Sequence, residues 1–130
     1  LPRGAMEPEP MIVAGFGFRT GASEDSFADA LRQATTSHSP QAPAAIADKT
    51  RWLSQFAYAQ SLPLITVAAD QLVAQATLTQ SAASMARAGT GSVAEATALA
   101  AAGPGARLAG PRSISTDRMA TCAIAIGDTT

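Results

Sequence analysis

The sequence lacks the charge pattern and the long apolar runs that several classes of protein require. Lys and Arg total 9 against 10 Asp and Glu, so the formal net charge is −1. A balanced chain of this kind has no basic excess for nucleic acid or for an anionic membrane surface. No apolar run approaches the ~20 residues of a transmembrane helix, and no signal peptide is recognisable. We therefore expect a cytoplasmic protein with neither nucleic acid nor membrane among its partners.

The residues of familiar catalytic and metal centres are also scarce. Cys122 is the only cysteine, so it cannot form an internal disulfide, and its strand-like surroundings predict a buried side chain. The only histidine, His38, lies in a polar loop without neighbouring metal ligands. No Ser–His–Asp set can be built around it, and there is no Walker sequence. The residues alone therefore predict no catalytic group, no metal and no cofactor.

The length of the chain, 130 residues, suits one domain with a substantial core. Residues 1–6 (LPRGAM) look like the remnant of a protease site and cloning, and the EPEP that follows is expected to be a flexible lead-in. We expect residues 1–10 to lie outside the fold and residues 11–128 to form a single domain.

The most informative stretch is 11–31, which combines a strand, a glycine-rich turn and a helix. Met11–Ala14 is an apolar run typical of a strand buried on both faces. A turn is predicted next, over 15–21. Ser23 stands at the N-cap position, and apolar residues spaced at helical intervals follow it. Such a unit opens an α/β domain and directs backbone N–H groups toward an anion.

Strands and helices are predicted to alternate along the rest of the chain. Strands are expected over 44–47, 64–67, 106–109 and 119–126, and helices over 50–61, 70–74, 81–88 and 92–102. Alternation of this kind indicates a largely parallel sheet covered on both faces. The link between the last two strands is too short for a helical crossover, so that pair should be antiparallel. The predicted fold class is α/β: a three-layer α/β/α domain with a mixed, mostly parallel sheet of about five strands.

Several side chains have predicted structural roles in the helices. Trp52 is expected in the core with its helix neighbours. Leu78 and Met85 are the expected anchors of 69–88, where the periodicity weakens. Ser92 and Glu95 match a capping box, in which the serine accepts from the N–H of Glu95 and the glutamate side chain returns to the helix start.

Candidate binding residues gather at the carboxyl ends of the predicted parallel strands, where α/β proteins bind ligands. Arg19, Lys49 and Arg112 each follow a predicted strand. Cations and helix N-termini together suit carboxylates or phosphates. The predicted ligand-binding residues are Gly15, Gly17, Arg19, Gly21, Ser23, Lys49, Gly89, Thr90, Gly91, Ser92 and Arg112.

Each of these features also has a purely structural explanation. Glycines after a strand more often serve the geometry of a turn. Three residues separate Gly17 from Gly21, one more than in the dinucleotide-binding motif, although Asp48 after the second strand keeps a nucleotide site open. Capping alone explains Ser92, and the three cations are equally explained as solvated surface charges.

Four segments occur in the order typical of a known family: 15–21 (GFGFRTG), 48–49 (DK), 91–96 (GSVAEA) and 123–125 (AIA). Over 11–127 the chain resembles the cobalamin-biosynthesis family that contains stand-alone CobE and the C-terminal domain of CbiG. It departs from the family pattern at three positions. Phe18 replaces a small residue or cysteine, Thr20 a basic residue, and Arg112 a lysine.

The resemblance implies a role in assembling the corrin ring. The first hypothesis is a protein that binds or carries a corrin intermediate, whose acetate and propionate carboxylates suit the three cations. CbiG-type proteins open the lactone of cobalt-precorrin-5A, so the alternative is a hydrolase or lyase acting on a precorrin, although this chain is similar only to their C-terminal part. A nucleotide-binding or structural subunit is the third hypothesis. The implied partners are a corrinoid or precorrin and other enzymes of the cobalamin pathway.

Overall fold

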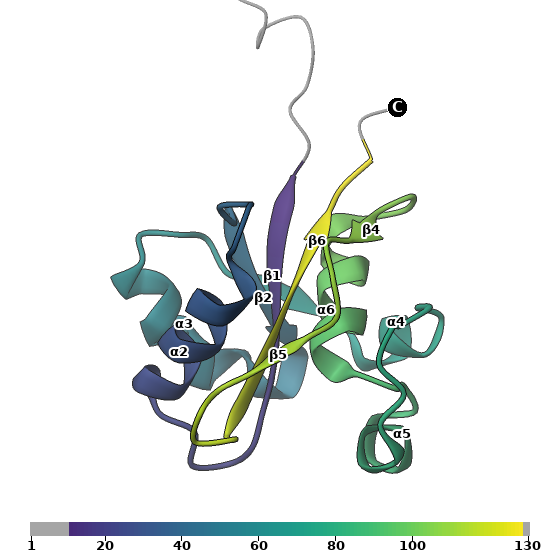
Figure 1. The fold of residues 1–130 in the computed structure, drawn as a ribbon, viewed down its shortest axis with the longest axis horizontal. Coiled ribbons are helices and arrows are strands. Elements are labelled where there is room, and N and C mark those ends of the chain that lie inside the picture. Colours follow the sequence, from purple (N-terminus) through teal and green to yellow (C-terminus); the bar gives the residue numbers. More distant parts are fainter. Residues whose placement is uncertain (1–10, 129–130) are drawn as a thin grey trace, which may run out of the picture.

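A mixed sheet forms the centre of the molecule, with helices on both of its faces (Figure 1). The computed structural model describes residues 11–128, so the predictions for residues 1–10 fall outside the described part. The strands are β1 (Ile12–Phe18), β2 (Ala42–Ile46), β3 (Ile65–Val67), β4 (Arg107–Leu108), β5 (Ser113–Ile114) and β6 (Ala120–Ile126). The helices are α2 (Glu24–Ala34), α3 (Thr50–Ala59), α4 (Ala69–Val73), α5 (Ala82–Ala88) and α6 (Val93–Ala102), with a 3₁₀ turn η1 (Ala47–Lys49) before α3. Within residues 11–128, no helix has the length and apolar character needed to cross a membrane.

The strand order is β3-β2-β1-β6-β4, with β5 also paired to β6. The pairs β1–β2 and β2–β3 are parallel, whereas β6 is antiparallel to β1, β4 and β5. Five of the six described strands therefore point one way and β6 points the other. This confirms the mixed, mostly parallel sheet, the antiparallel last pair and the interior position of β1. The short β5 is a strand that the sequence did not predict.

Residues of β1 alternate between two cores. Phe16 faces α2 and α3, where its ring centroid lies 6.1 Å from that of Phe27 and 5.9 Å from that of Phe56. Val13 faces the opposite way and packs with Ala96 of α6 and Leu72 of α4. Edge-on aromatic contacts favour a defined packing on the first face. The three-layer arrangement is thus confirmed.

Three side chains predicted in the core are exposed instead: Trp52 by 44%, Leu78 by 61% and Met85 by 49%. In α3 the buried stripe runs through Leu53 and Phe56, and Trp52 lies beside it, stacked under the guanidinium of Arg51 at 4.4 Å. Between β3 and α6 the chain is anchored by Leu72, which is fully buried. Cys122 is buried as predicted, and burial raises the pKa of its thiol.

The predicted turn over 15–21 is wrong at its start, because β1 continues to Phe18. A Cβ atom on Gly15 would overlap the backbone of Ala94 and Ala98 in α6 and lie 2.7 Å from the Cβ of Ala98. Glycine is therefore needed here for the close approach of α6 to the sheet. The turn is confined to 19–22, where the N–H of Ala22 donates to the carbonyl of Arg19.

Candidate ligand-binding site

A pocket of about 280 Å³ lies at the carboxyl ends of β1 and β2. Its walls come from the ends of these strands, η1, β5, the start of β6, α5 and the first residue of α6. This is the edge of the sheet at which the sequence predicted a site. The antiparallel β6 begins at this edge, which brings the β5–β6 hairpin to the same place.

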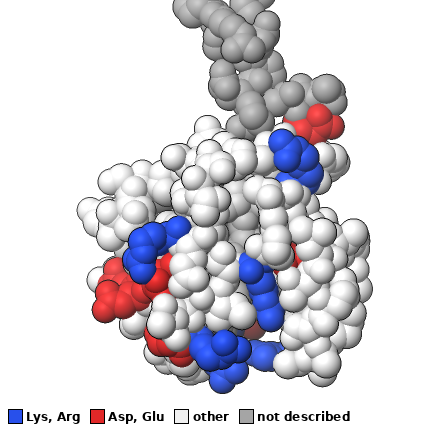
Figure 2. Space-filling view, viewed as in Figure 1, with Lys and Arg blue, Asp and Glu red and all other residues white. Residues whose placement is uncertain are grey.

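The described residues that line the pocket carry five cations and a single carboxylate, that of Asp48. The cations are Arg19, Lys49, Arg87, Arg112 and Arg118. Figure 2 shows blue side chains meeting at the lower end of the molecule, the end to which β1 runs in Figure 1. Apolar side chains, including Phe18 and Ile114, complete the lining. A concave surface with such an excess of one charge attracts anions and concentrates the field on them.

Lys49 is held at the rim of the pocket by two aromatic rings. Its Nζ lies 5.4 Å from the ring centroid of Phe18 and 5.8 Å from that of Trp52. Cation–π attraction restricts the ammonium without neutralising it. Lys49 is thus a positioned cation that keeps its capacity to bind an anion.

Arg112 is tied to α6 by the buried carboxylate of Glu95. This carboxylate accepts hydrogen bonds from the N–H groups of Arg112 (2.9 Å), Leu78 (2.6 Å) and Thr79 (3.0 Å), and from the hydroxyl of Thr79. Burial raises the pKa of Glu95, but these hydrogen bonds outweigh it and hold the pKa below its ordinary value. An ionised Glu95 therefore joins α6 to the 77–80 loop and to the pocket.

The capping-box prediction is correct for Ser92 and wrong for Glu95. The Oγ of Ser92 accepts from the N–H of Glu95 at 3.2 Å, as expected of an N-cap. The side chain of Glu95 does not return to the helix start, because three N–H groups from distant loops take its oxygens.

Replacing Ser92 with alanine should lower the free energy of unfolding by about 1 kcal/mol, because the N-cap acceptor is lost. Urea unfolding followed by circular dichroism measures this change. A variant of unchanged stability that no longer bound or converted a ligand would contradict the capping role and give the hydroxyl a chemical one.

Four of the predicted site residues line the pocket: Gly17, Arg19, Lys49 and Arg112. The others have structural positions. Gly15 packs against α6, and Gly21 adopts φ 95° in the turn before α2. Ser23 caps α2, Gly89 ends α5 at φ 71°, and Thr90, Gly91 and Ser92 lead into α6, where a Cβ on Gly91 would meet the 77–80 loop. Of the two predicted helix N-termini, that of α6 reaches the pocket through Val93. A contact between any of these residues and a ligand stays a prediction.

Two pocket cations, Arg87 and Arg118, are absent from the predicted set. Arg118 precedes a strand that was predicted to be antiparallel, and such a strand begins where its parallel neighbours end. That signal was available in the sequence. Arg87 lies in the last turn of α5, within the segment of weak periodicity, so nothing in the pattern pointed its side chain toward the sheet.

Comparisons with known proteins agree with this fold. The family model described as Cobalamin synthesis G C-terminus matches residues 12–125. CobE, a protein from the cobalamin (vitamin B12) biosynthetic pathway, is 28% identical with a TM-score of 0.80, and the match covers 95% of each chain. The cobalamin biosynthesis protein chiG from Agrobacterium tumefaciens str. C58 is 37% identical with a TM-score of 0.70, over 91% of this chain and 99% of its own. A search of curated protein sequences finds no match. The chain therefore belongs to the cobalamin synthesis G C-terminus family of cobalamin-biosynthesis proteins.

Proposed function

We propose that the protein binds or carries a corrin intermediate in this pocket. The observation that carries the proposal is the excess of five cations over one carboxylate at the carboxyl ends of the strands. A corrin intermediate is a largely apolar macrocycle edged with carboxylates, so it matches both the cations and the apolar lining. Membership of a cobalamin-biosynthesis family supports this ligand class over other anions.

The volume of the pocket suggests how such a ligand sits. At about 280 Å³ it is slightly smaller than most pockets that enclose a drug-sized molecule. One edge of the macrocycle, with its acid side chains, would enter, and the remainder would stay outside. Partial enclosure suits a carrier, since the exposed part of the ring stays within reach of a pathway enzyme.

Replacing Arg19 with alanine should weaken the affinity for cobyrinic acid, a corrinoid with free carboxylates, by about one to two decades. The estimate follows because a hydrogen bond to a charged group contributes about 1.5–3 kcal/mol. A visible-absorbance titration of the protein with cobyrinic acid measures the affinity. Arg107→Ala is the matched control, because the exposed Arg107 lies on β4 at the opposite end of the sheet and should leave the affinity unchanged.

Esterification of the ligand gives an independent test. The methyl ester of cobyrinic acid, with every carboxylate blocked, should bind more weakly than the free acid, and added salt should weaken binding of the acid. An ester that binds as tightly as the acid would contradict the proposed site chemistry. An Arg19→Ala, Lys49→Ala double variant with unchanged affinity would do the same. The alternative function is a precorrin hydrolase or lyase. When a precorrin is the added ligand, such an enzyme would give an absorbance spectrum that continues to change after binding is complete.

A further inference from the structure

The hairpin between β5 and β6 contains an arginine in a backbone conformation that arginine rarely adopts. Arg118 has φ 63°, in the left-handed region. The hairpin is closed by hydrogen bonds from the N–H of Ser115 to the carbonyl of Ala120 and from the N–H of Arg118 to the carbonyl of Ser115, both 2.8 Å. Glycine or asparagine normally occupies a left-handed position in such a loop, because other side chains are strained there.

Asp117 holds this turn in shape from within. Its carboxylate accepts hydrogen bonds from the hydroxyl of Ser115 at 2.6 Å and from the N–H of Met119 at 3.1 Å. The second carboxylate oxygen accepts from the hydroxyl of Ser26 on α2 at 2.6 Å. The turn is therefore fixed on both sides of Arg118 and attached to a helix.

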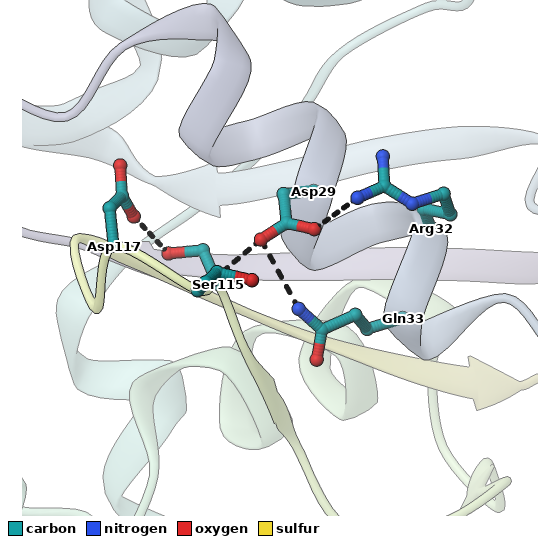
Figure 3. Close-up of polar contacts among 6 residues, drawn as sticks. Asp29, Arg32, Gln33, Ser115 and Asp117 are labelled. Atoms are coloured by element: carbon teal, nitrogen blue, oxygen red, sulfur yellow. Dashed lines mark hydrogen bonds and ion pairs between the residues drawn. The ribbon is translucent and has the colours of Figure 1, made fainter.

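Asp29 of α2 provides a second attachment. It accepts from the N–H of Thr116 at 2.6 Å and from the side-chain amide of Gln33 at 3.2 Å, and it pairs with Arg32. Figure 3 shows Asp29 directed from the helix toward the turn that carries Ser115 and Asp117. Hydrogen bonds lower the pKa of both carboxyl groups, that of Asp29 chiefly through Thr116 and that of Asp117 chiefly through Ser115. Two ionised carboxylates thus hold the strained turn against α2.

We infer that the turn is a preformed anchor in which Arg118 binds a ligand carboxylate, with Asp117 and Asp29 as positioning residues. This inference rests on the proposed function. Glycine or asparagine would close the same hairpin with less strain, yet an arginine occupies this position and its side chain lines the pocket. Strained positions of this kind concentrate at ligand sites. A guanidinium can bind both oxygens of a ligand carboxylate at once. A ligand amide or ester lacks the second charged oxygen and cannot be bound in this way. Arg118 is therefore assigned as a determinant of the preference for acid over amide side chains.

Arg118→Asn is the direct test, because asparagine tolerates the left-handed region. The melting temperature should stay equal or rise, while the affinity for cobyrinic acid falls at least tenfold. Ser61→Asn is the matched control, since Ser61 has φ 58° in the turn after α3, away from the pocket, and its replacement should leave the affinity unchanged. Unchanged affinity in Arg118→Asn would overturn the inference, and wild-type protein that fails to bind cobyrinic acid would overturn the proposed function with it.

Asp117→Ala separates positioning from simple charge. Removing a negative charge near the pocket should raise the affinity for an acid if only long-range electrostatics act. Positioning predicts a fall of several-fold, which should disappear when Arg118 is already asparagine. Asp117→Asn, which keeps an acceptor oxygen, should recover part of the affinity. A fall of equal size in both backgrounds, or higher affinity in Asp117→Ala, would overturn the role assigned to Asp117.

Discussion

Replacing Glu95 with alanine is expected to lower the free energy of unfolding by at least ~3 kcal/mol, because each buried donor left without an acceptor costs about 1–3 kcal/mol. The Glu95 side chain is fully buried and accepts from three backbone N–H groups and one hydroxyl. Alanine supplies no acceptor to these four donors. Urea unfolding followed by circular dichroism measures the loss. Glu24→Ala is the control, since Glu24 is an exposed acid in the first turn of α2 and should contribute only ~0.5 kcal/mol.

Glu95→Gln separates the parts of this network. The amide oxygen can still accept from Leu78 and Thr79, whereas its NH₂ group would face the N–H of Arg112, donor against donor. The variant should have a stability between those of the wild type and the alanine variant, and it should bind cobyrinic acid more weakly because Arg112 is released. A glutamine variant as stable as the wild type would show that the charge of Glu95 contributes nothing.

The dependence of folding stability on pH should also show the contribution of the Glu95 carboxylate. Burial raises the pKa of Glu95, but the hydrogen bonds lower it by more, so the pKa lies below its ordinary value of 4.5. As the pH falls below 4.5, the unfolded chain binds a proton at Glu95 before the folded chain does, so the stability contributed by its charge is progressively lost. The wild type should therefore lose stability more steeply with acid than Glu95→Gln does. Asp29 and Asp117 act with the same sign in both proteins, so equal slopes would contradict the role of Glu95.

The elements that the sequence predicted well are those with local signals. Ser23 caps α2 and Ser81 caps α5, and the helix after η1 ends before Pro63, as expected of a proline. The alternation of apolar residues identified β6. These features depend on a few neighbouring residues, which is why they can be read without knowing the fold.

The features that escaped prediction depend on contacts between distant segments. The partners of Glu95 lie 16 and 17 residues away, so its capping-box spacing was misleading. Leu78 is exposed because its backbone, not its side chain, is anchored by that carboxylate. The turn in which Arg118 has a positive φ is likewise hydrogen-bonded to α2, about 90 residues away in the sequence. The spacing of apolar residues along the sequence predicts none of these contacts.

The site was located by topology rather than by motif. The rule that ligands bind beyond the carboxyl ends of parallel strands placed Arg19, Lys49 and Arg112 together, and all three line the pocket. The glycines led to a wrong start for the predicted turn, because the sequence does not distinguish a glycine needed for close packing from one needed for a turn. The small residues of α6 were the overlooked signal: a helix of the sequence VAEATALAAA can approach a sheet closely only where the strand beneath it also lacks side chains.

Replacing Gly15 with alanine tests that explanation and should destabilise the protein by about 3 kcal/mol, the upper part of the range for overpacking. The new Cβ would overlap the backbone of α6 at Ala94 and Ala98. Because these neighbours are backbone rather than flexible side chains, the helix itself has to move away from β1. Displacing α6 also moves Glu95 and, through it, Arg112, so the affinity for cobyrinic acid should fall together with the stability.

Gly110→Ala is the matched control, because a Cβ on Gly110 meets no atom within 4 Å and that variant should unfold like the wild type. Thermal and urea unfolding of both variants, with absorbance titrations alongside, distinguish packing from ligand contact. If Gly15 serves packing, stability and affinity fall together, and in Gly15→Val the larger side chain prevents folding. If Gly15→Ala instead kept its stability and lost only its affinity, Gly15 would belong to the binding surface, and the close contact between α6 and β1 would not be the reason for glycine at this position.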